Sequence, residues 1–135
     1  MSGLGAGETV AARAVAALKA IGGLGVYDAP PLQAVAPYAV VETGPETDWG
    51  HKSGEGRELR LALTLWDRGE RPVRLRALTR AAEAALEGIE GEPPGDGWQL
   101  VSLQFLRERA VPPRAPAPNA LTASVVEYRA RLLAL

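Results

Sequence analysis

Asp48, His51 and Ser53 are the residues whose types and spacing come nearest to a catalytic set in this sequence. Within six positions they supply the carboxylate, imidazole and hydroxyl of a hydrolase triad. A working triad also needs a rigidly oriented base and an oxyanion hole, which are normally gathered from separate elements. The pattern G-H-K-S-G at 50–54 departs from the nucleophile elbow G-x-S-x-G. We therefore expect solvated loop residues here, and no enzyme.

The segment 44–53 also partly matches a phosphate-binding loop, which has four residues between two glycines and then Lys and Ser or Thr. Here five residues separate the glycines, a histidine precedes the lysine, and two acidic side chains would repel phosphate. No helical pattern follows to offer its positive N-terminus. His51 is the single histidine, and no pair of acids has a metal-ligand spacing. The sequence therefore predicts neither a metal site nor a cofactor.

This segment belongs to a long connection, residues 43–57, between two short apolar stretches. A link of this length between strands usually marks a functional or flexible loop. Trp49 lies in it among polar residues, where a tryptophan commonly anchors an interface. The alternative, in which the loop folds back and buries Trp49 on its own domain, fits the sequence nearly as well.

The elements that must position this connection can be read from hydrophobic periodicity. Tyr38–Glu42 is typical of a strand, and at 59–66 leucines alternate with other residues, the period of a strand with one apolar face. Apolar residues at helical spacing predict helices over about 8–20, with Thr9 as a possible cap, and from Pro72 to about Ile89. Further strands are expected at 98–107, with Val101, Leu103 and Phe105 on one side and Leu100 on the other, and at 121–132.

This order of elements predicts an α+β fold in a single domain of 135 residues. We expect one mainly antiparallel, four-stranded sheet with the two helices packed on its leucine-rich face. The stretch 111–119 contains four prolines and is expected to form an exposed, semi-rigid loop or arm. The other face of the sheet is available for partners.

Composition and charge exclude several classes of protein. Apolar residues make up 47% and charged residues 23%, there is no cysteine, and neither a signal peptide nor a membrane span is predicted. The formal net charge of −1 argues against broad electrostatic binding of nucleic acid.

The charges fall in opposed blocks. Residues 56–80 hold seven basic and three acidic side chains, and residues 81–100 hold five acidic and no basic ones. If the blocks lie on different faces, copies could dock head to tail in a cyclic oligomer. If folding intersperses them, they form an ordinary solvated surface.

Several segments in a fixed order resemble one protein family. They are V-Y-D-A-P-P at 26–31, P-Y-A-V-V-E at 37–42 and D-W-G-H-K-S-G-E-G-R-E-L-R-L-A-L-T-L-W-D at 48–67. Together they resemble the tail-completion, or tail-terminator, proteins of long-tailed phages and of phage-like gene transfer agents. The resemblance includes the helix after Asp67 and V-S-L-Q-F at 101–105, and thus most of the chain. The proline-rich stretch departs from the family.

This resemblance implies an α/β subunit that forms a hexameric ring at the head-proximal end of the tail tube. The ring ends tube polymerisation, presents a surface to the head or neck connector protein and leaves a central channel through which DNA passes. No catalysis, cofactor or membrane is implied. The protein would assemble in the bacterial cytoplasm and remain in the virion or gene-transfer-agent particle. Two alternatives stay open: a head-side neck or connector protein, and a small ligand-binding domain or hydrolase that uses residues 43–57 as a lid.

The residues proposed for these contacts fall into two sets. In the connection, facing the tube or a neighbouring subunit, they are Trp49, His51, Lys52 and Arg57. Between subunits, Arg60, Arg74, Arg76 and Arg80 are expected to pair with Glu83, Glu87 or Glu90 of the adjacent copy.

Overall fold

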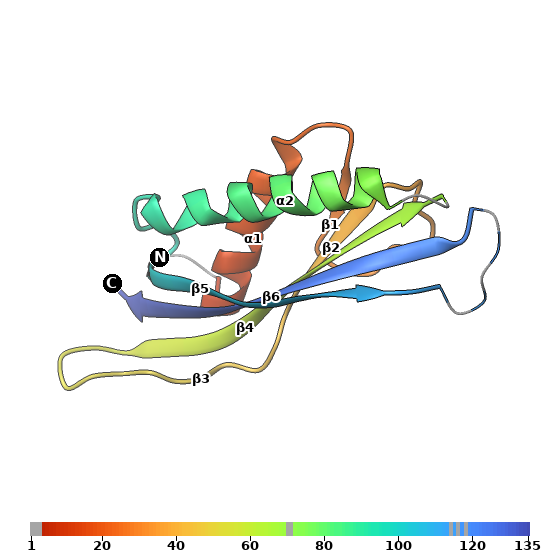
Figure 1. Ribbon diagram of the computed structural model, residues 1–135. Coiled ribbons are helices and arrows are strands. Elements are labelled where there is room, and N and C mark those ends of the chain that lie inside the picture. Colours follow the sequence, from red (N-terminus) through yellow and green to blue (C-terminus); the bar gives the residue numbers. More distant parts are fainter. Residues whose placement is uncertain (1–3, 70–71, 114, 116, 118) are drawn as a thin grey trace.

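A computed structural model describes residues 4–69, 72–113, 115, 117 and 119–135. The elements follow one another as α1 (Ala6–Lys19), β1 (Gly25–Tyr27), β2 (Tyr38–Thr43), β3 (Thr47–Asp48), β4 (Gly56–Arg68), α2 (Val73–Glu87), the short 3-10 helix η1 (Gly88–Gly91), β5 (Trp98–Val111) and β6 (Leu121–Ala134). Both helices lie on the same side of one twisted sheet (Figure 1). The predicted α+β class is therefore confirmed.

Over the described residues the sheet has six strands, so the prediction of four was wrong. Its order is β1-β2-β4-β6-β5, and β3 pairs with β4 outside this path. β1 runs parallel to β2, and the other pairings are antiparallel. The two unpredicted strands have three and two residues, too few to show an alternating pattern. The sequence therefore predicts only an extended piece and part of a loop at these positions.

The long strands β4 and β6 form the centre of the sheet. They pair from Gly56 opposite Leu133 to Arg68 opposite Leu121. Because side chains alternate across a strand, this register places the β4 leucines and the alternate residues of β6 on the helix side. These side chains form one buried layer: Leu59, Leu61, Leu63, Leu65, Val126, Tyr128, Ala130 and Leu132.

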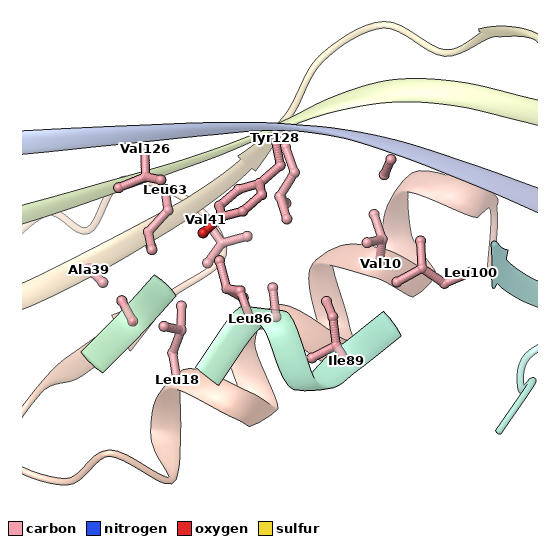
Figure 2. Packing of buried hydrophobic residues seen from close by; sticks show 14 of the residues in the cluster. Val10, Leu18, Ala39, Val41, Leu63, Leu86, Ile89, Leu100, Val126 and Tyr128 are labelled. Carbon is pink, nitrogen blue, oxygen red and sulfur yellow. The ribbon is translucent and has the colours of Figure 1, made fainter. Parts of the chain in front are cut away.

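Each helix buries one stripe of residues on this layer. The stripes are Ala6, Val10, Ala14 and Leu18 in α1, and Leu75, Thr79, Ala82 and Leu86 in α2. Figure 2 shows side chains from both helices meeting those of the strands, among them Leu86 and Leu63. Ile89, expected within the second helix, belongs to η1 and is 1% exposed. The helix-to-sheet arrangement therefore follows the predicted periodicity.

The start of α1 differs from the prediction. Gly5 is the N-cap, and the Thr9 hydroxyl donates to the Gly5 carbonyl at 2.9 Å instead of capping the helix. Thr9 is 1% exposed, so this bond satisfies a hydroxyl that the core would otherwise leave unpaired.

The edge strand β5 departs from simple alternation. Register shifts occur between Leu100 and Ser102 and between Phe105 and Arg107. An extra residue at such a shift turns the side chains after it to the other face. Leu100 is therefore buried at 4% exposure, although it was assigned to the side opposite Leu103, and Val101 is 38% exposed. The alternation expected for residues 98–107 was wrong for this reason.

The proline-rich stretch lies in the connection between β5 and β6. Pro112 and Pro113, with Trp66, line an apolar pocket at this end of the sheet. Residues 114, 116 and 118 lie outside the described part of the chain, as do residues 70 and 71 of the predicted turn after β4.

Candidate contact surfaces

The connection between β2 and β4 is a hairpin, and the long loop expected there was wrong. β3 pairs with the start of β4, with Thr47 opposite Glu58 and Asp48 opposite Arg57. Beyond β3, the Trp49 amide donates to the Gly56 carbonyl at 3.0 Å, and His51 and Gly54 form a further bridge. In Figure 1 this hairpin extends beyond the other strands. We call residues 47–56 the arm.

Gly56 allows the two sides of the arm to meet closely. A Cβ atom at this position would lie 2.4 Å from the Trp49 carbonyl oxygen. Real Cβ atoms do not approach a backbone oxygen so closely, so a side chain here would push the strands apart. On the other side of the arm, the Asp48 carboxylate accepts the Gly50 amide at 3.0 Å. The arm thus has a defined backbone, built without a long apolar run.

Trp49 is neither fully exposed nor fully buried, so it combines features of the two alternatives that the sequence left open: an interface anchor and a residue packed on its own domain. Its ring is partly buried, with the Arg131 guanidinium 5.4 Å from the ring centre and His51 in an edge contact at 5.0 Å. The indole therefore fixes the arm to β6 while part of it stays accessible. His51 and Lys52 are exposed at the tip. Arg57 pairs with Glu55 at 2.7 Å and approaches Glu46 at 3.9 Å.

The arm does not assemble the triad considered from the sequence. The Asp48 carboxylate is bonded to the Gly50 amide, and within the described residues no hydrogen bond joins His51 to Asp48 or Ser53. A strand, β4, follows where a phosphate-binding loop requires a helix. In the described part of the chain, no three His, Asp or Glu side chains gather as a metal ion would require.

A second surface lies along α2. Five charged side chains recur at intervals of four and three, four of them on one stripe of α2 beside its buried stripe and the last in η1: Arg76, Arg80, Glu83, Glu87 and Glu90. The two charge blocks thus share one side of α2, with the basic residues near its start and the acidic ones near its end. Arg60 lies elsewhere, on the outer face of the sheet opposite Arg129 of β6.

Arg74 already has a partner within its own chain. Its Nε donates to Asp67 Oδ2 at 2.7 Å, and a second guanidinium nitrogen contacts Oδ1 of the same carboxylate. Asp67 is 5% exposed. The hydrogen bond from Arg74 lowers the pKa of Asp67 below its usual value, against the opposing effect of burial. Arg74 therefore has an ion-pair partner within its own chain, and its pairing with an adjacent copy stays a prediction.

The charged stripe of α2 borders a groove over β5 and β6. At the acidic end, a pocket of about 490 Å³ is lined by Glu83, Glu87, Glu90, Leu103, Phe105 and Tyr128. A second hollow of about 530 Å³ shares Glu83 and continues toward Arg76, Arg80 and Arg109. α2 packs on β4 and β6 and leaves this side of the edge strand open, so Phe105 is 50% exposed.

In the single chain, negative charge at the acidic end of the groove is unfavourable because carboxylates lie close together and are partly buried. Burial, and then the neighbouring Glu108 and Glu87 carboxylates, raise the pKa of Glu83, while Arg80 opposes this. Burial, followed by the charges of Glu83, Glu87 and Glu108, raises the pKa of Tyr128. A cation in this pocket would relieve both effects.

The sequence pointed to the three glutamates but not to Phe105, Tyr128 or Glu108. Phe105 and Tyr128 are paired across β5 and β6, with their ring centres 5.9 Å apart. Their separation of more than twenty positions hides this pairing until the strand register is known. The alternation of residues 98–107 predicts only that Phe105 lies on the apolar side of its strand.

The outer face of the sheet carries a separate network of ion pairs. Arg131 donates to Glu58 at 2.7 Å, Arg107 pairs with Glu127 at 2.5 Å, and Arg129 contacts Gln104. Because these cations have partners within the chain, they offer less free positive charge than the sequence suggests.

Comparison with known proteins gives a match to one family and matches to solved structures. The model of a family described as tail completion protein gp17 matches residues 9–133, from α1 through β6. Among solved structures, a chain in a structure titled "Virion of native gene transfer agent (GTA) particle" is 28% identical in sequence, with a TM-score of 0.56. The similarity covers 86% of this chain and 84% of that one. No curated protein matches.

Proposed function

Because the chain belongs to the tail completion protein gp17 family, we propose that it is a structural subunit that closes into a ring on the head-proximal end of a phage-like tail. The ring would end growth of the tail tube, join the tail to the head or neck connector protein, and leave a central channel for DNA. The family match over residues 9–133 carries this proposal. The likeness to a chain in a gene transfer agent particle supports the same role.

The two contact surfaces suit a subunit that binds neighbours on different sides. The arm extends beyond the other strands (Figure 1). The groove along α2 opens over the edge strand. A heterologous contact between unlike surfaces generates a ring when its rotation closes. We propose the arm residues Trp49, His51 and Lys52, together with Arg57 and Arg60 of β4, for one side of this contact. The α2 stripe of Arg76, Arg80, Glu83, Glu87 and Glu90 supplies the other.

The ring is proposed to be a homo-hexamer that works by shape and self-association, without catalysis or a cofactor. It would assemble in the bacterial cytoplasm and stay in the finished particle, at the junction of tail and neck. In the described part of the chain, no helix is long and apolar enough to cross a membrane.

The proposal is tested with particles made without this protein. We expect tail tubes of irregular length that fail to join heads, because nothing ends tube growth or offers a joining surface. Adding the purified protein to tubes of normal length should restore joining, and native mass measurement should detect a six-copy ring on the tube. Uniform, head-joined tails in its absence would overturn the proposal. Tubes of normal length that merely fail to join heads would indicate a neck or connector protein.

A further inference from the structure

The acidic pocket beside α2 has features of a binding site for a cation carried on a protein chain. Three carboxylates, Glu83, Glu87 and Glu90, surround an apolar and aromatic wall formed by Leu103 and Phe105. Such a wall packs against the methylene groups of a long basic side chain, while carboxylates and an aromatic face attract its charge. A hydrated metal ion would gain nothing from this apolar wall, because apolar side chains neither coordinate a metal ion nor form hydrogen bonds with its water ligands.

The Tyr128 hydroxyl adds an unpaired polar group to the lining of this pocket. Tyr128 is 3% exposed and lines the pocket, and Figure 2 shows its ring pointing from β6 toward the helix layer. Among the described residues, no group forms a hydrogen bond with this hydroxyl. This hydroxyl is not one of the fully buried atoms that lack a partner, so its oxygen can be reached from the pocket. A chain entering the pocket could supply one.

The tip of the arm carries a cation without a partner. Lys52 is exposed and forms no ion pair with any residue that the structure describes. This differs from Arg57, at the base of the arm, which has Glu55 and Glu46 beside it. The paired backbone of the arm holds Lys52 at the point farthest from the arm's base. Its ammonium is therefore presented outward on a defined support.

We propose that the acidic pocket receives the arm tip of a second copy of this chain, with the Lys52 ammonium among Glu83, Glu87 and Glu90. This inference rests on the proposed ring and names the contact that closes it. Each copy would insert its arm into the next, so the contact joins unlike surfaces and can repeat around a ring. Long-range attraction between the tip and the pocket would also guide the copies into register.

Covalent coupling of an amine to a carboxylate tests the contact directly. The chain has two lysines, Lys19 and Lys52. Treatment of the assembled protein with a carbodiimide should form amide bonds between Lys52 of one copy and Glu83, Glu87 or Glu90 of another. Peptide mass spectrometry of copies mixed with isotopically labelled chain then separates bonds between copies from bonds within one. Bonds between copies that map to other residues, with none at Lys52, would overturn the inference.

Charge reversal supplies a second readout with matched controls. Lys52→Glu should weaken self-association at least tenfold in sedimentation, whereas Lys19→Glu, which makes the same charge change on α1, should leave it within twofold. Glu87→Lys should also weaken association, and the double variant Lys52→Glu with Glu87→Lys should recover most of it. Both positions are exposed, so circular dichroism should show an unchanged fold.

The outcomes separate this inference from the proposed function. If the wild-type protein forms rings on tubes and Lys52→Glu forms them equally well, the arm contact is wrong and the ring stands. If the wild-type protein neither self-associates nor binds tubes, both are wrong. Loss of association in Lys52→Glu without recovery in the double variant would place the partner of Lys52 outside this pocket, and so would overturn the inference.

Discussion

The guanidinium of Arg131, on the last strand, lies 5.4 Å from the centre of the Trp49 ring at the base of the arm. The same guanidinium donates to Glu58 at 2.7 Å, so one side chain links β6, β4 and the arm. This contact joins residues that are more than eighty positions apart. It makes the arm part of the folded body.

Replacing Trp49 should therefore loosen the arm while leaving the body intact. Trp49→Leu keeps apolar bulk but removes the aromatic face, and should cost about 0.5–1 kcal/mol of unfolding free energy. Hydrogen exchange at the amides of residues 49–54 should accelerate, and exchange in β4 beyond Leu61 should not. Equal acceleration throughout the sheet would show that the arm and the core open together.

Substituting alanine at two glycines of the arm should give opposite results. In Gly56→Ala the added Cβ would lie 2.4 Å from the Trp49 carbonyl, so we expect the pairing of the arm to break. In Gly54→Ala nothing lies within 4 Å of the added atom, and the arm should persist. Amide exchange and tail-joining activity measure the two effects. Wild-type joining by Gly56→Ala would show that the form of the arm is unimportant.

The leucine layer should dominate stability. Leu63→Ala removes a fully buried side chain and should lower the free energy of unfolding by about 2–5 kcal/mol, from lost burial and from the cavity left behind. Leu32→Ala makes the same chemical change at a fully exposed side chain and should alter the free energy of unfolding by less than about 0.5 kcal/mol. Urea unfolding of the two variants measures the difference, and similar losses would contradict this core.

The ion pair between Asp67 and Arg74 should make the free energy of unfolding depend on pH in the acid range. Because the pKa of Asp67 is lowered in the folded chain, the unfolded chain binds this proton more readily. The stabilisation is then complete above about pH 4, the pKa of an unperturbed aspartate, and is lost as the pH falls through the folded pKa. Asp67→Asn should cost about 1–3 kcal/mol at pH 7 and flatten this dependence.

Urea midpoints at pH 7 and pH 3 provide the measurement for Asp67. Asp28→Asn, at an exposed position, is the control and should retain the acid dependence of the wild-type protein. The same dependence in Asp67→Asn would assign the acid sensitivity to other carboxylates.

Glu83 should change the pH dependence of stability in the direction opposite to Asp67. Its pKa is raised by burial and by Glu108, so the folded chain holds the proton more tightly than the unfolded chain. Its contribution to stability is present below the unfolded pKa and is lost as the pH rises through the folded pKa. Glu83→Gln should therefore raise the melting temperature of the isolated chain at pH 7 and change it little below about pH 4. A lower melting temperature at pH 7 would contradict the strain assigned to this pocket.

The residue pattern by itself determined the elements with long, regular periods. Each of these elements buries one face: β4 through its leucines, β6 through alternate residues, and α1 and α2 through one stripe each. The apolar residues of a buried face recur every two positions in a strand and every three or four positions in a helix, so the sequence shows them directly. The α+β class followed from these elements and their order, and the family resemblance followed from the sequence segments at 26–31, 37–42 and 48–67. Lys52 and the acidic end of α2 were also identified, because an unusual charge can be seen without a structure.

Only the tertiary structure decided which distant residues meet. The arm depends on Gly56 accommodating the Trp49 carbonyl and on Arg131 reaching across from β6, and neither has a periodic signal. The pocket depends on the register that pairs Phe105 with Tyr128, on shifts within β5, and on α2 stopping short of the edge strand. Hydrophobic periodicity fixes which face of an element is buried, but strand register and the packing of helices on the sheet arise from the sum of contacts over the whole fold. For that reason the sequence identified the charged residues, and only the tertiary structure showed that they line one groove.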